Sequence, residues 1–315
     1  MSIQNCFEPS CISKTGAIEL VVESQAKDLG GFSVSWLLPS EMRQTVGPFI
    51  FFDHIGPATF APGSGVNVRP HPHIGLATVT YLFEGELTHR DSLGFVQAIQ
   101  PGAVNWMSAG RGIVHSERTP EALRDEGSRL HGIQSWISLP VVAEETDPDF
   151  SHYPSEVLPT IELPGVSMSL IAGSAFGDRS PVVTASPMFY LAAEMDAGSE
   201  FVMPDEYEER AVYIVKGSLV VDGEGFSTGQ LIVFQRDRRI TIVCEDNARL
   251  MLLGGAAIDG PRYLWWNLVS HSRERIEKAK ADWKNGRFDK VPGETEFIPL
   301  PEDRAKKQRI DRGKR

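Results

Sequence analysis

Short strand-like segments, separated by turn residues at close spacing, constrain the fold of this chain more than any other feature of its sequence. Segments such as Ala17–Ser24 and Phe32–Leu38 are alternating or β-branched and are bounded by glycine. Among the 315 residues are 29 glycines and 21 prolines, a composition that favours many short elements joined by turns. The pattern predicts antiparallel sandwiches or barrels and argues against alternating βαβ units.

One stretch in each half of the chain follows the same pattern. Thr80–Leu87 (TYLFEGEL) matches Val212–Leu219 (VYIVKGSL) at an offset of 132 residues. Each half then reaches a turn glycine before another apolar strand. A repeat of this kind predicts an all-β protein built from two similar barrels in tandem.

Composition also suggests where the two domains begin and end. One segment, Ser272–Asn285, reads as a helix with a serine cap at its start and Gly286 after its end. A stretch rich in proline and acidic residues between the halves is typical of a linker. We therefore expect an N-terminal barrel at 1–142, a linker at 143–164, a second barrel at 165–270, and a helix with a basic tail at 271–315.

Charge, cysteine content and hydropathy exclude several classes of protein. The chain has 31 Lys+Arg against 42 Asp+Glu, a formal net charge of −11, which argues against direct nucleic-acid binding. No apolar run approaches the roughly 20 residues that cross a bilayer, and the first residues lack a secretory signal. Cys6, Cys11 and Cys244 are expected to be free thiols. We expect a cytoplasmic protein with no membrane association, and a monomer.

The basic residues are unevenly distributed. Residues 304–315 (RAKKQRIDRGKR) hold seven basic residues and one aspartate, a net +6, so the rest of the chain carries −17. We interpret this tail as a solvated terminus, because it lacks the interleaved aromatic residues that bind single-stranded nucleic acid. Contact with nucleic acid through the tail is the alternative interpretation.

Two pairs of residues, all of types that bind metals, indicate the chemistry of this protein. His71-x-His73 is followed, after 41 intervening residues, by His115-x-Glu117. Because residues i and i+2 of a strand face the same side, each pair can direct two ligands into one barrel interior. Three imidazoles and one carboxylate suit Fe(II), Mn, Ni, Cu or Zn, and are too rich in nitrogen for Ca or Mg. An octahedral ion with four protein ligands keeps two positions open for O2 or a chelating substrate.

A His-x-His pair alone would also fit a surface pair or a core pair, and the second pair is what favours a metal. In the second half the same offset leads from the histidine pair to Met203 and Asp205, which predicts a barrel without metal. We expect each of the other histidines to contact a metal ligand without binding the metal, to have a structural role or to be exposed. They are His54, His89, His131, His152 and His271.

Several segments resemble the pirin family of the cupin superfamily. The resemblance implies two face-to-face barrels with one iron in the N-terminal barrel, held by the four residues that the spacing singles out. Where general cupins have a glutamate after His-x-His, this chain has Ala77 and Thr78, so Glu117 takes the carboxylate role. The segments are Pro48–His54 (PFIFFDH), Pro70–Tyr81 (PHPHIGLATVTY), Trp106–Glu117 (WMSAGRGIVHSE), His131–Trp136 (HGIQSW) and Phe288–Pro301 (FDKVPGETEFIPLP).

Two functions follow from this resemblance. In the first, the protein is a dioxygenase that opens the ring of a flavonol such as quercetin, or of a related enediol, with Glu117 as both ligand and catalytic base. In the second, the iron is a redox switch, and the protein acts by binding a protein partner as a transcriptional or metabolic co-regulator. We favour the enzyme, because all four predicted ligands are present.

Overall fold

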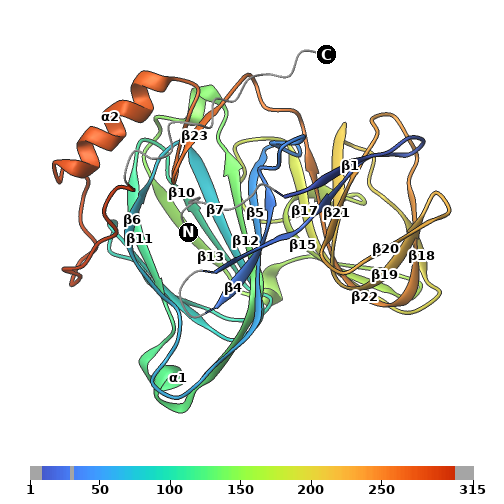
Figure 1. Cartoon of the computed structure of the whole chain (residues 1–315), viewed down its shortest axis with the longest axis horizontal. Helices are drawn as coiled ribbons and strands as arrows, with labels where there is room; N and C mark the ends of the chain where they lie inside the picture. The colour runs from blue at the N-terminus through green and yellow to red at the C-terminus, as the bar shows by residue number, and fades with distance from the viewer. Residues whose placement is uncertain (1–8, 29–31, 302–315) are drawn as a thin grey trace.

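The computed structural model of the chain describes residues 9–28 and 32–301. They form two β-barrels that lie side by side, with a helix on the outer side of the first (Figure 1). The all-β, two-barrel prediction is confirmed. The basic tail at 304–315 and Cys6 lie outside the described residues.

The first barrel closes a seven-stranded sheet against a four-stranded sheet. Their orders are β13-β10-β7-β12-β5-β4-β3 and β6-β11-β8-β9. The larger sheet contains β3 (Gln25–Asp28), β4 (Ser33–Leu38), β5 (Phe49–Phe60), β7 (Leu76–Glu84), β10 (Val104–Ser108), β12 (Ser128–Ser138) and β13 (Asp149–Tyr153). The smaller contains β6 (Asn67–His73), β8 (Leu87–Asp91), β9 (Val96–Ile99) and β11 (Ile113–Arg118).

The second barrel is one continuous antiparallel sheet, whose main path runs β1-β2-β21-β19-β22-β17-β15-β14. Its strands are β1 (Cys11–Ser13), β2 (Ile18–Glu23), β14 (Thr160–Leu163), β15 (Val166–Ala175), β16 (Asp178–Arg179), β17 (Met188–Met195), β18 (Glu200–Val202), β19 (Glu209–Val221), β20 (Glu224–Ser227), β21 (Gln230–Phe234) and β22 (Thr241–Gly255). The remaining elements are helices α1 (Glu121–Glu126) and α2 (Arg273–Lys284), 3-10 turns Val141–Ala143 and Ser155–Val157, and the hairpin β23 (Tyr263–Trp265) and β24 (Leu268–Ser270).

Strand pairing crosses the expected domain bounds. β1 and β2, at the start of the expected first domain, join the sheet of the second barrel through β21. Within the expected linker, β13 pairs with β10 of the first barrel and β14 pairs with β15 of the second. The segment between the barrels is therefore built into both sheets, while the exact domain limits stay a prediction.

The repeat corresponds to equivalent strands. The first copy lies on β7 and the start of β8, and the second on β19. Their aligned glycines, Gly85 and Gly217, adopt φ of 88° and 92°, where a Cβ would meet the backbone of a neighbouring strand at 2.1 and 2.6 Å. Gly85 follows the end of β7 and Gly217 lies at a register shift within β19, and both positions require a residue without a Cβ.

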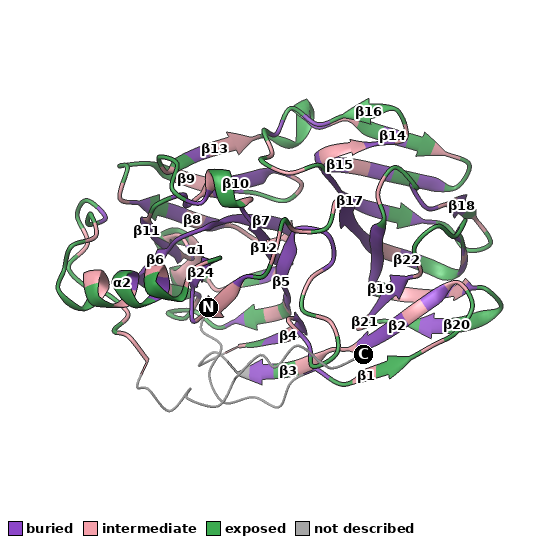
Figure 2. Cartoon of the chain, turned by 90° about the horizontal axis from the view of Figure 1, so that it is seen from above, coloured by how far each residue is buried: buried purple, intermediate pink, exposed green. Residues whose placement is uncertain are grey.

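The larger sheet of the first barrel is covered on both faces. Phe49–Ile55 of β5 is buried at every position, as expected of a strand with no solvent-facing side. Phe52 belongs to an apolar cluster that also contains Tyr190 and Tyr213 of the second barrel. Buried strands of the two barrels face one another in Figure 2, so the barrels share one core.

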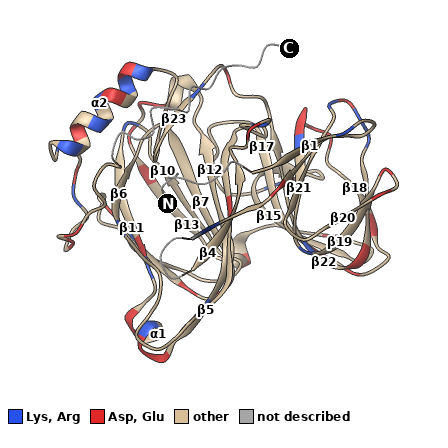
Figure 3. Ribbon diagram, in the orientation of Figure 1, with Lys and Arg blue, Asp and Glu red and all other residues tan. Residues whose placement is uncertain are grey.

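The C-terminal helix forms as predicted. The Ser272 side chain caps the first turn of α2 by accepting the backbone N–H of Arg275, and Ile276 and Ala279 are its buried residues. Acidic and basic residues alternate along α2, whereas most barrel strands carry few charged residues (Figure 3). Among the described residues, no helix is long and apolar enough to span a membrane.

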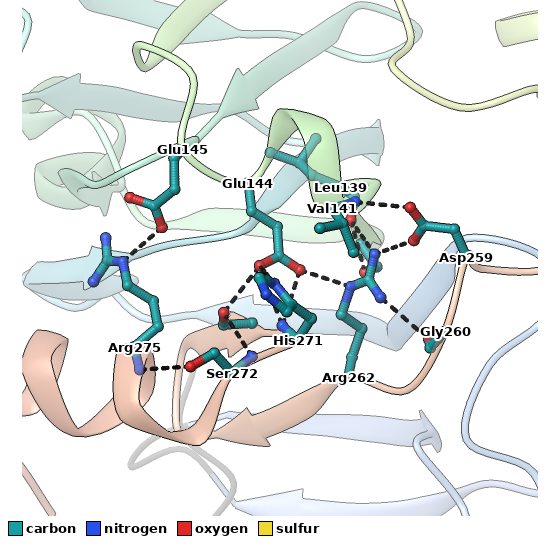
Figure 4. A network of polar contacts seen from close by, with 12 residues as sticks. Leu139, Val141, Glu144, Glu145, Asp259, Gly260, Arg262, His271, Ser272 and Arg275 are labelled. Carbon is teal, nitrogen blue, oxygen red and sulfur yellow. Dashed lines mark hydrogen bonds and ion pairs between the residues drawn. The ribbon is translucent and has the colours of Figure 1, made fainter.

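A buried ionic cluster ties the chain before α2 to the end of the first barrel (Figure 4). Glu144 Oε1 lies 2.8 Å from Arg262 Nε, and both side chains are at most 2% exposed. Glu144 also accepts hydrogen bonds from the Ser270 hydroxyl and from the backbone N–H of His271. Arg262, Ser270 and His271 all follow the last strand of the second barrel in sequence, whereas Glu144 follows β12 of the first barrel. The cluster therefore attaches the segment after the second barrel to the first barrel.

Candidate metal centre

The predicted ligands lie on two adjacent strands of the small sheet. β6 is an edge strand, which allows the prolines on either side of His71, because an edge strand need not use every N–H for pairing. β6 pairs with β11 so that His71 stands directly opposite His115. The ladder shifts register between His115 and Glu117, a local irregularity of the kind found beside active sites.

Three imidazoles converge in the barrel interior. One nitrogen from each of His71, His73 and His115 lies within 4.8 Å of the others, and all three residues are at most 2% exposed. The Nε2 atoms of His73 and His115 are 3.1 Å apart. The structure thus brings together the three histidines that the sequence singles out.

Burial keeps these imidazoles uncharged. Desolvation lowers the pKa of His71, His73 and His115 well below 6.5, and the neighbouring imidazoles lower it further. A neutral imidazole offers a lone pair to a metal, whereas an imidazolium does not. The cluster is therefore in the protonation state that a transition metal requires at neutral pH.

In His71 and His115, the contact made by Nδ1 determines that Nε2 is the nitrogen available to a metal. His71 Nδ1 is 2.9 Å from the carbonyl oxygen of Arg69, so its N–H lies there and Nε2 is left with a lone pair. His115 Nδ1 is 3.4 Å from His89 Nδ1, and His89 Nε2 is 2.9 Å from Asp91 Oδ2. A proton donated along this chain toward Asp91 leaves His115 Nε2 free. The donor set and its supports fit a transition-metal ion.

Glu117 is buried nearby but is not a member of the three-imidazole group. It is 7% exposed, and its Oε1 accepts a hydrogen bond from the Thr80 hydroxyl at 3.0 Å. Thr80 lies on β7 of the opposite sheet, so this bond crosses the barrel interior. The roles of Glu117 as fourth ligand and as catalytic base stay predictions.

The other predicted positions lie apart from the cluster. At the repeat-equivalent positions of the second barrel, Met203 is buried and Asp205 is exposed. Within the described residues, the three-imidazole group is the single cluster of metal-binding type. His54 and His131 bond to each other near the contact between the barrels, and His271 belongs to the ionic cluster around Glu144.

Sequence reasoning named His89 among the histidines that could support the site but did not single it out, and it missed Asp91. Asp91 is fully buried, and its Oδ1 accepts the backbone N–H groups of Leu93 and Phe95. The His89 ring stacks on Phe150 with 4.2 Å between centroids. The i, i+2 spacing of His89 and Asp91 on one strand, the same spacing that identified the ligand pairs, is the signal that could have found them.

Family models match both halves of the chain. A model described as Pirin matches residues 31–137, and one described as Pirin C-terminal cupin domain matches residues 190–289. A pirin-like protein of Caulobacter vibrioides is 50% identical over 291 residues, 90% of this chain and 100% of the relative. A Pseudomonas aeruginosa protein that is provisionally named quercetin 2,3-dioxygenase is 40% identical over 273 residues, 85% of this chain and 84% of that relative.

Solved structures show the same fold. The crystal structure of a quercetin 2,3-dioxygenase from Acinetobacter baumannii has a TM-score of 0.84 at 32% identity, with 91% of this chain and 95% of that chain covered. A bacterial pirin of Escherichia coli in complex with nickel(II) has a TM-score of 0.59 at 20% identity, with 75% and 96% covered. The first similarity extends to sequence, whereas the second is a similarity of fold.

Proposed function

We propose a metal-dependent dioxygenase function for this chain, which belongs to the pirin family, with flavonols such as quercetin as the substrate class. The observation that carries the proposal is the convergence of three buried, uncharged imidazoles in the first barrel. Similarity to proteins named quercetin 2,3-dioxygenase supports the choice of reaction.

His71, His73 and His115 would hold the ion, with Glu117 as the proposed fourth ligand. Fe(II) is the metal that we propose, and Mn, Ni, Cu and Zn suit the same nitrogen-rich set. When bound, the metal supplies Lewis acidity toward the hydroxyl and keto oxygens of a chelating flavonol and an open position for O2.

The residues of the chain would bind, orient and deprotonate the substrate. The Glu117 carboxylate would accept the proton of the flavonol hydroxyl, and the Thr80 hydroxyl would hold that carboxylate in place. Burial of the surrounding side chains would exclude water from the reaction. One O2 is consumed per flavonol, and the products are a depside and carbon monoxide.

Aerobic incubation of the iron-loaded protein with quercetin tests this function. The flavonol absorption band is expected to bleach, and His115→Ala is expected to abolish the bleaching. His131→Ala is the matched control, because His131 is partly exposed and bonds to His54, which is no part of the three-imidazole group. Absence of bleaching with any first-row metal would overturn the proposal.

A partner-binding regulator is the second candidate, and one observation favours it. Phe95, 45% exposed beside β9, contacts Phe150, which stacks on His89 behind His115. A change in the charge of the metal would shift His115 and the rings packed behind it, and so change the surface around Phe95. If a purified partner bound the ferrous and ferric proteins equally, this candidate would be rejected. Cytoplasmic location and a monomeric state remain predictions under either function.

A further inference from the structure

The chain after the second barrel holds the outer edge of β6 at two points. We call residues 268–298 the C-terminal clamp. The N–H of Val269 donates to the carbonyl oxygen of Ile74 at 3.1 Å, one residue after the ligand pair of β6. The N–H of Ile298 donates to the carbonyl oxygen of Pro70 at 2.8 Å, one residue before that pair. The clamp therefore bonds to the backbone on both sides of the two β6 histidines.

The same segment holds β11 between its two predicted ligands. The Ser116 hydroxyl donates to Glu294 Oε1, and Ser116 is fully buried. Glu294 Oε2 lies 2.6 Å from Arg118 Nη2, and the Glu294 side chain is 10% exposed. The ladder between β6 and β11 shifts register at this position, so sheet pairing alone fixes it less firmly. Glu294 supplies a bond from outside the barrel where the pairing is irregular.

Aromatic residues fix the clamp itself. Trp283 Nε1 donates to the carbonyl oxygen of Ile298 at 3.0 Å, and the Trp283 ring makes edge contacts with Phe288 and Phe297. Phe288 packs over Gly112, where a Cβ would lie 2.8 Å from its ring. α2 and the segment after it thus form one packed unit over the strands that carry the ligands.

We propose that the C-terminal clamp sets the separation of β6 and β11, and that Glu294 is a positioning residue for the metal centre. The inference rests on the proposed function only in requiring that the imidazoles bind a metal. Metal ligands must be held within a few tenths of an ångström, so a strand freed from its outer anchor binds the ion less tightly. Because coupling between two sites is reciprocal, bound metal stabilises the docked clamp in return.

Competition between the full-length protein and a chelator for Ni(II) tests the proposal. Glu294→Ala is expected to weaken Ni(II) binding about tenfold, the effect typical of losing a residue that orients a metal ligand. Ser116→Ala removes the same hydrogen bond with a smaller change in side-chain size. The double variant is expected to bind Ni(II) about as weakly as Glu294→Ala alone. Glu294→Gln, which keeps an acceptor for Ser116, is expected to restore part of the affinity.

Glu296→Ala is the matched control. Glu296 also pairs with Arg118, but it is 56% exposed and makes no bond to Ser116. If Glu294→Ala and Glu296→Ala bound Ni(II) as tightly as the wild type, the clamp proposal would be wrong while the metal site stood. If the wild type bound no metal at all, the proposed metal site would fail first.

Amide hydrogen exchange gives a readout that a merely structural contact would not change. Ni(II) is expected to slow exchange at the Ile298 amide, which bonds to Pro70, in the wild type and less so in Glu294→Ala. The absorption bands of bound Ni(II) are expected to shift in Glu294→Ala, because the ligand geometry relaxes. Exchange and absorption bands identical in the two proteins would overturn the coupling.

Discussion

His54 of the first barrel and Tyr213 of the second share a hydrogen bond, with 2.8 Å between His54 Nδ1 and the Tyr213 hydroxyl. The other nitrogen of His54 lies 2.7 Å from His131 Nε2. Burial, with a smaller contribution from the charge of His131, lowers the pKa of His54 to about 3. At this point the barrels are thus joined by an uncharged polar chain beside the apolar core that they share.

Removing the Tyr213 hydroxyl should weaken this contact. Tyr213→Phe leaves His54 Nδ1 buried without its partner, and we expect a loss of about 1–3 kcal/mol in the free energy of unfolding. Urea unfolding monitored by tryptophan fluorescence measures it. Tyr153→Phe, outside this polar chain, is the control; an equal effect of both variants would contradict the assigned role.

Asp53 should make stability fall as pH rises. Burial raises the pKa of its carboxyl from 3.8 to about 7, although the charge of Lys27 lowers it. The unfolded chain loses this proton near pH 4 and the folded chain near pH 7, so the contribution is greatest below pH 4 and falls by about 4 kcal/mol by pH 8. The cross-strand neighbours of Asp53 are the uncharged Trp36 and Gln134, and Tyr213 is affected by its charge.

Asp53→Asn should remove this pH dependence. Urea unfolding of the metal-free protein at pH 5 and pH 8 measures the effect, since bound metal would add a pH dependence of its own. The stability difference between the two pH values should be smaller in the variant than in the wild type. Asp149→Asn, an exposed position, should change nothing. A wild-type pH profile in Asp53→Asn would refute the assignment.

His89 should contribute to metal affinity without binding the metal. His89→Phe can keep the stacking on Phe150 but removes the nitrogen that receives the His115 N–H. We expect Ni(II) affinity to fall about 10- to 100-fold. Phe150→Leu, which loses the stacking and keeps the nitrogen, should bind Ni(II) more tightly than His89→Phe in chelator competition. The reverse order would show that packing, not the hydrogen bond, supports the ligand.

Breaking the buried pair of Glu144 and Arg262 should cost more than removing both charges. Arg262→Met leaves Glu144 charged and buried, and a loss of about 3–5 kcal/mol is expected. The double variant Glu144→Gln with Arg262→Met should recover part of that loss. Denaturant unfolding of the three proteins forms the test, and a double variant no more stable than Arg262→Met would contradict it.

Local patterns predicted the parts of the protein that depend on neighbours in sequence. The i, i+2 spacing placed His71 and His73 on one face of a strand, and the serine before α2 marked its start. The pairing of β2 with β21, the bond of Ser116 to Glu294 and the support of His115 by His89 join residues far apart in the chain. Such long-range partners depend on how the barrels close, and no short stretch of sequence specifies them.

The larger sheet of the first barrel serves two interiors at once. Along β12, Gln134 bonds to Thr80 inside the metal-bearing barrel, and the next residue, Ser135, bonds to Tyr190 of the second barrel. One inserted residue would exchange these two sets of side chains. A change of ligand preference at this sheet, natural or engineered, must therefore replace one side chain by another without inserting or deleting residues. The loops at the barrel ends can vary in length.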